Sequence, residues 1–300
     1  MKTTLAVLAA LFFAAAIVTP AFGEPPAEPD RTDAPKWDKP KTYMVIAAVG
    51  EQFTVMFRVS SVALGTNIKP NFRRRSVTVR NNVLNRFVLR SMDEAIAKVD
   101  PTSKRLFMTL RAKDMDAVKP QERERVAIDE IVADLKGMPE REDWDRIVIV
   151  TPAYKAFDYN GVDGELAGFG VFYQPHGNTD MQTGGMRYFD GEDAITPENM
   201  FVRTSIYAAP FSMIEIWVLD PKTLAVLDKQ QRYDNVKLFD PRSDSVTIVG
   251  NVKPEVLFDK FSTLVDRSVT AAVERSTMLA RRPQVDVGNV KEVSTEDAKK

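Results

Sequence analysis

The chain has 300 residues, with 41 basic and 42 acidic side chains, a single histidine and no cysteine. This nearly balanced charge gives no support for a nucleic-acid partner. The absence of cysteine excludes disulfide bonds, thiolate metal ligands and a cysteine nucleophile.

The first 23 residues have the three parts of a secretory signal peptide. Lys2 provides a positive start, residues 5–18 form an apolar run, and Ala21-Phe22-Gly23 places small residues at the two cleavage positions. The apolar run is shorter than the roughly 20 residues that a transmembrane helix needs. We expect cleavage after Gly23, no membrane-spanning segment once the signal is removed, and a periplasmic location.

Two polar segments flank the remainder of the chain. Residues 24–41 are rich in proline and charge and nearly free of aliphatic side chains, so they are expected to form a disordered linker. Residues 283–300 have the same character and are expected to form a disordered charged tail. Residues 42–282 contain frequent apolar runs without an interrupting linker, which predicts a single domain.

The first half of this domain alternates between strand-like and helical patterns. Residues 43–49 and 53–59 are β-rich and are separated by three residues around Gly50, which predicts a hairpin. An amphipathic helix is expected after the Asn81-Asn82 cap, ending at Pro101, and a second helix from Pro120 to Gly137. Residues 105–112 predict a short buried strand, and residues 145–154 another strand.

The second half is mostly strand-like and ends in a helix. Residues 164–175, 209–221 and 223–233 predict strands, the last two joined as a hairpin by Asp220-Pro221-Lys222. Trp217 lies in a run that is apolar on both faces and is expected in a central strand. A final helix is expected from Pro254 to just before Pro283. The predicted fold class is α/β (α+β), with a mixed β-sheet of about six to seven strands and three amphipathic helices packed on it.

The glycines of the 164–175 run carry a separate expectation. Gly168 and Gly170 lack the third glycine of a dinucleotide-binding loop and lie inside a strand pattern, and no Walker-type motif occurs, so no cofactor is expected. Glycine at such positions allows a neighbouring backbone or ring to pack closely.

The segments IEIWVLDPKTLAVLDKQ and FDKFSTLVDRSVTAAVER, together with the element order, resemble the amino-terminal domain of TolB and the envelope lipoproteins that activate peptidoglycan synthases. They are also similar to a group of uncharacterised exported bacterial proteins. The resemblance implies an envelope location and no particular activity. The chain departs from the lipoproteins because it lacks the cysteine that carries their lipid.

His176 is the only histidine and lies in a run of Gly, Asn, Asp, Thr and Gln. Histidine can act as a base, but a serine triad also needs an exposed nucleophile, and neither a G-x-S-x-G nor an S-x-x-K motif occurs. We expect His176 to be an exposed loop residue. In the alternative function, a carboxylate-dependent hydrolase, Asp158 and Asp163 line the site together with His176.

The acidic run DYNGVDGE offers oxygen ligands for a cation in Asp158, Asn160, Asp163 and Glu165. The EF-hand pattern requires glycine at the sixth loop position, where this chain has Asp163, so the spacing does not fit and no metal site is expected. Asp and Asn beside Gly are typical of a turn between two strands.

One basic cluster stands out from the balanced charge. It consists of Lys69, Arg73, Arg74, Arg75 and Arg80. Such a cluster suits an anionic partner, such as phospholipid head groups or a cell-wall polymer. The competing interpretation is that the arginines pair inside the fold with Asp114, Asp116 or Glu122.

These patterns predict an exported periplasmic protein that acts as a non-enzymatic binding or interaction module of the envelope. Its partner would be another envelope protein or an anionic envelope surface. The alternative is a carboxylate-dependent hydrolase that acts on an envelope substrate.

Overall fold

The computed structural model describes residues 40–59, 71–110, 118–159, 162–174, 191–245 and 247–279. The chain divides into two units after Lys39, and every described residue belongs to the second, Pro40–Lys300. The predicted signal peptide and tail, and all but the last two residues of the predicted linker, lie outside these residues. Their boundaries therefore remain predictions.

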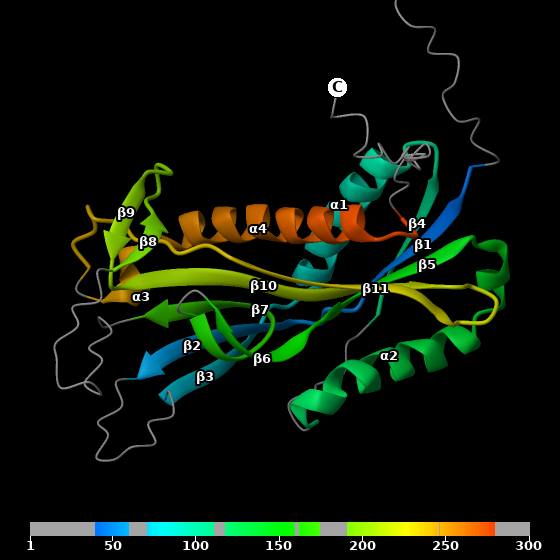
Figure 1. Cartoon of the computed structure of the whole chain (residues 1–300), viewed down its shortest axis with the longest axis horizontal. Coiled ribbons are helices and arrows are strands. Elements are labelled where there is room, and N and C mark those ends of the chain that lie inside the picture. The colour runs from blue at the N-terminus through cyan, green and yellow to red at the C-terminus, as the bar shows by residue number, and fades with distance from the viewer. Residues whose placement is uncertain are drawn as a thin grey trace, which may run out of the picture. The chain divides into compact units, whose positions relative to one another are not determined.

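A mixed sheet of nine strands forms the centre of the described residues (Figure 1). Its strands are β1 (Thr42–Ala47), β2 (Gln52–Val59), β3 (Asn71–Thr78), β4 (Lys104–Thr109), β5 (Arg146–Pro152), β6 (Tyr154–Tyr159), β7 (Val162–Gln174), β10 (Tyr207–Leu219) and β11 (Val226–Asn235). A separate hairpin is formed by β8 (Glu192–Ile195) and β9 (Phe201–Thr204). The helices are α1 (Val83–Val99), α2 (Pro120–Lys136), the short α3 (Ile248–Asn251) and α4 (Pro254–Arg275). The predicted fold class is confirmed, with more strands in the sheet than expected.

Strand β10 is the central strand that joins the two parts of the sheet. On one side it pairs with β11 over residues 211–219. On its other side, residues 207–213 pair with β7 and residues 214–219 with β5, so β7 and β5 follow one another along β10. The next two strands outward are β1 and β2. Strand β1 pairs with β5 and strand β2 pairs with β7, both in parallel orientation. Strands β4 and β3 lie outermost, on β1 and β2 respectively.

The hairpin predicted for residues 43–49 and 53–59 is wrong. Strands β1 and β2 both exist, but they pair with β4, β5, β3 and β7 and not with each other. The reason lies in β1, whose residues from Tyr43 to Ala47 are buried on both faces. A strand that is apolar on both faces belongs inside a parallel sheet, where it has two neighbours.

The helices cover both faces of the sheet. In Figure 1, α1 and α4 lie on one side and α2 on the other. Alternation along β10 explains this, because Ile214, Ile216 and Val218 pack with α1 and α4, whereas Trp217 and Leu219 pack with α2. Since every residue of β10 from Tyr207 to Val218 is buried, the prediction that Trp217 lies in a central strand is confirmed.

Two local expectations are corrected. Strand β4 is an outer strand with half-exposed and exposed side chains, not a buried one, and Phe107 is among its exposed residues. Asn82 does precede α1, but it has a left-handed backbone with φ of 54° and its side chain makes no capping hydrogen bond. Asn tolerates that conformation better than most residues, which accounts for its position.

The glycine expectation is confirmed at Gly170. A Cβ atom there would overlap the carbonyl oxygen of Thr54 on β2 and the ring of Phe211 on β10. Only glycine lets β7 lie between these two neighbours at this point.

Candidate functional site

The arginine run lies on the outer strand β3. Its register places Arg73 opposite Phe57 and Arg75 opposite Val55 on β2. Side chains alternate along a strand, so Arg73 and Arg75 share one face of the sheet and Arg74 lies on the other. All three arginines are exposed. The structure thus brings Arg73, Arg74 and Arg75 together on a single strand.

The remaining members of the predicted cluster are not part of this strand. Arg80 is exposed in the connection between β3 and α1, and Lys69 lies outside the described residues. Of the acids in the competing interpretation, Glu122 is in the first turn of α2, whereas Asp114 and Asp116 lie outside the described residues.

The ionic surroundings of the three arginines differ. The Arg74 side chain has an interaction partner. Among the described residues, Arg73 and Arg75 take part in no ion pair, unlike Arg105, Arg232 and Arg242, each of which has an acidic partner. Two guanidinium groups that have no ion-pair partner in the described part of the chain therefore lie on the same face of β3.

The predicted carboxylate site is only partly described. Asp158 lies in β6 and Asp163 lies directly opposite it in β7, so both belong to paired strands and not to the turn that DYNGVDGE suggested. Glu165 is also in β7, opposite Ala156, while Asn160 and His176 lie outside the described residues. Within the part of the chain that the structure describes, no three Asp, Glu or His residues are grouped in a way that could hold a metal ion. The hydrolase site of Asp158, Asp163 and His176 remains a prediction.

A different acidic group, which the sequence patterns do not predict, lies inside the sheet. Glu215 lies in the middle of β10 with only 1% of its surface exposed. The Lys229 ammonium on β11 is 3.2 Å from Glu215 Oε1 and also forms an ion pair with Glu124 on α2. It lies 4.9 Å from the centre of the Trp217 ring. The only signal in the sequence is an acid inside the apolar run MIEIWVL.

Burial, together with the neighbouring charge and hydrogen bond of Glu124, raises the pKa of the Glu215 carboxyl to about 7, against the opposing effect of Lys229. Its Oε2 atom is buried without a hydrogen-bond partner among the described residues. A carboxyl that ionises near neutrality can serve as a general acid or base. Here the group is closed off from solvent and engaged by Lys229, so it acts as an internal contact between α2 and the sheet.

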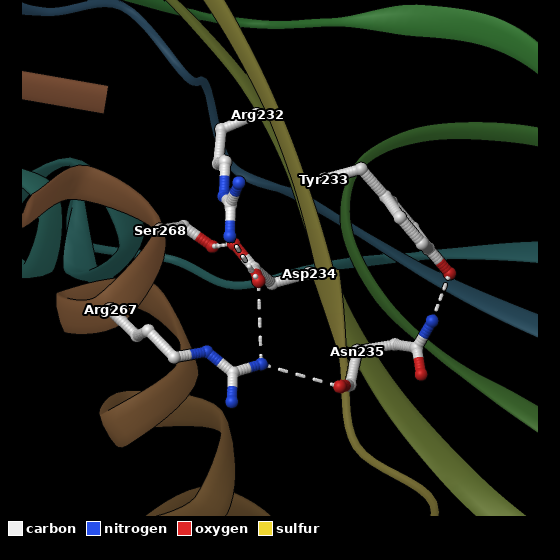
Figure 2. Close-up of polar contacts among 6 residues, drawn as sticks. All are labelled: Arg232, Tyr233, Asp234, Asn235, Arg267 and Ser268. Atoms are coloured by element: carbon white, nitrogen blue, oxygen red, sulfur yellow. Dashed lines mark hydrogen bonds and ion pairs between the residues drawn. The ribbon is translucent and has the colours of Figure 1, made fainter. Parts of the chain in front are cut away.

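A second polar network joins α4 to β11 (Figure 2). Asp234 is almost fully buried and accepts hydrogen bonds from Arg232 Nε at 2.9 Å and from the Ser268 hydroxyl at 2.8 Å. Arg267 on α4 is 3.4 Å from the same carboxylate and donates to the Asn235 carbonyl oxygen at 3.4 Å. Tyr233 and Asn235 contact each other through a separate hydrogen bond of 2.7 Å. Because the Asp234 carboxylate is saturated by internal donors, this network is structural.

The hairpin of β8 and β9 carries the most exposed large apolar side chain in the described residues. Phe201 is 85% exposed, and Met200 beside it is also exposed. Lys260 on α4 donates to the Asn199 side chain at 2.5 Å, which holds the tip of this hairpin near α4.

No protein-family model and no curated protein matches the chain. Among solved structures, it is similar to protein XCC0632 from Xanthomonas campestris, of family model DUF330, with a TM-score of 0.31, 7% identity and coverage of 79% of this chain and 84% of that chain. Lipoprotein GNA1162 from Neisseria meningitidis gives a TM-score of 0.28 and 8% identity over 76% of this chain and 97% of that chain. A putative neuraminyllactose-binding hemagglutinin homologue from Helicobacter pylori gives a TM-score of 0.31 and 7% identity, over 80% of this chain and 87% of that chain. These similarities do not assign the chain to a family.

None of the helices in the described ranges has the length and apolar character required of a membrane span.

Proposed function

We propose that the protein is an exported, non-enzymatic binding module of the periplasmic envelope, and that the outer strand β3 binds an anionic partner. The observation that carries this proposal is the pair of exposed arginines, Arg73 and Arg75, which lie on one face of β3 and form no ion pair with an acid of the described residues. The predicted signal peptide supports the location.

The geometry of the pair suits an anion. Residues two positions apart in a strand are separated by about 7 Å. Guanidinium groups at that spacing can bind neighbouring carboxylate or phosphate groups, each through a pair of parallel hydrogen bonds. Since the whole chain carries almost no net charge, the attraction would be local to this strand and screened by salt.

The test is co-sedimentation of the mature chain with washed envelope fragments across a series of salt concentrations. Each arginine near a charged surface contributes about 1 kcal/mol, so Arg73→Gln with Arg75→Gln should weaken binding about thirtyfold at low salt. The melting temperature should stay nearly unchanged because both side chains are exposed.

The matched control removes two exposed arginines elsewhere, Arg125 on α2 and Arg203 on β9, by the same change to Gln. This control should bind as the wild type does. If wild-type binding is insensitive to salt, or if both double variants bind equally well, the proposal is wrong.

A further inference from the structure

We infer that β3 receives an extended acidic segment of a partner protein, which adds to the sheet as a further strand. This inference rests on the proposed function and specifies its partner as a polypeptide with alternating acidic residues.

Strand β3 has one open side in the described part of the sheet. All eight of its residues pair with β2, and among the described residues no strand pairs with its other side. An outer strand presents a row of backbone N–H and C=O groups at that side. Another extended backbone satisfies such a row by strand addition, which a lipid head group cannot do.

The charge of the β3 edge differs from that of two other outer strands, β4 and β11. On β4, Arg105 is neutralised by Asp93 at 2.5 Å, and on β11, Arg232 is neutralised by Asp234 at 2.9 Å. On β3, Arg73 and Arg75 have no such partner among the described residues. Unpaired positive charge repels other basic strands and protects an open edge from unspecific pairing. The same charge admits a strand of opposite sign.

Strand addition would also fix the spacing between the side chains of the partner and those of β3. Residues directly opposite each other on antiparallel strands have Cβ atoms about 4.5–5.5 Å apart, within reach of a carboxylate and a guanidinium. A partner with acids at every second position would place them opposite Arg73 and Arg75 on one face of the sheet. Acids spaced in this way define the segment that β3 selects.

The experiment measures binding of labelled peptides to the mature chain by fluorescence anisotropy. The parent peptide has the length of β3, 8 residues, and alternates Glu with Thr and Val. Three companions differ from it in one property each: two are N-methylated at alternate backbone amides, one in each frame, and the third has Lys in place of Glu. Vesicles of anionic phospholipid serve as a separate probe.

We expect the parent peptide to bind and to protect β3 amides from hydrogen exchange. One N-methylated frame should bind at least about tenfold more weakly because it loses backbone hydrogen bonds. The Lys peptide should not bind. Arg73→Gln with Arg75→Gln should weaken binding of the parent roughly tenfold, whereas Arg125→Gln with Arg203→Gln should have no effect.

The outcomes separate the two proposals. Equal binding of the parent and both N-methylated peptides would show attraction by charge alone and overturn strand addition, while leaving the anionic-partner function standing. Binding to vesicles without binding to the peptide would do the same in favour of a lipid. Failure of the vesicles, the peptides and the envelope fragments alike would overturn both.

Discussion

Glu215 makes the stability of the protein depend on pH. Because the pKa of its carboxyl is raised to about 7 in the folded chain, the folded state retains a proton that the unfolded state has lost above its own pKa. The free energy of unfolding should therefore fall as pH rises from about 4.5 to about 7, by up to about 3 kcal/mol.

Glu215→Gln should remove this dependence, since the amide has almost the same shape and does not ionise. Urea unfolding of both proteins between about pH 5 and about pH 8 measures the difference. A wild-type curve that is flat in this range, or a variant with the same slope as the wild type, would contradict the raised pKa.

The buried environment of Trp217 predicts how much its replacement lowers the free energy of unfolding. Its side chain is 6% exposed, and its indole N–H donates to the Thr151 hydroxyl at 3.0 Å. Trp217→Ala should lower the free energy of unfolding by about 3–5 kcal/mol. Trp217→Phe, which keeps a ring but loses the hydrogen bond, should cost about 1 kcal/mol. A loss below about 1 kcal/mol for the alanine variant would mean that the ring is not part of the core.

Single residues were predictable where local chemistry determines their role. Gly170 and Trp217 were placed correctly because a glycine within a strand and an aromatic residue in an apolar run have few alternatives. Glu215 was missed because its partners, Lys229 and Glu124, come from other elements. Whether Arg73 and Arg75 form ion pairs could not be predicted for the same reason, because it depends on which acids the tertiary structure brings near them.

At the level of elements, the contact between α4 and β11 depends on Asp234. Replacing Asp234 by Ala leaves the fully buried Ser268 hydroxyl without its acceptor and separates Arg232 from its counter-charge. We expect Asp234→Ala to lower the free energy of unfolding by about 3 kcal/mol. Arg267→Gln should cost at most about 1 kcal/mol, because Arg267 is 55% exposed and its distance to Asp234 is longer. Equal losses in thermal or urea unfolding would show that Asp234 is not the centre of this network.

Helices were easier to predict than strand pairing. The three long helices follow apolar residues at three- and four-residue spacing, a pattern contained within each segment. The hairpin of β10 and β11 was also predicted, because its turn residues are adjacent in sequence. Strands β1 and β2 were wrongly joined because their true partners, β5 and β7, lie far along the chain. Strand β3 was missed because three arginines hide its β-pattern.

For the molecule as a whole, the central position of β10 determines which strands unfold locally and which unfold only with the entire domain. Backbone amides of β10 are flanked by strands on both sides and covered on both faces. They should exchange with deuterium only through global unfolding, whereas β3, β4 and the β8–β9 hairpin should exchange through local opening. Mass spectrometry of peptides from the exchanged protein tests this. Exchange in β10 as fast as in β3 would contradict the prediction that β10 opens only by global unfolding.

The late position of β10 in the chain also governs how a growing polypeptide acquires its structure. When residues 42–174 have been synthesised, β1 can pair with β4 and β5, and β2 with β3 and β7, and the hairpin of β6 and β7 links the two groups, but the strand that pairs with both β5 and β7 is still missing. Residues 207–219 then pair with both β5 and β7 and align the two groups along one strand. Pairings this distant form slowly. The nascent chain can therefore complete this sheet only after residue 219 has left the ribosome, and until then β5 and β7 lack a strand that they share.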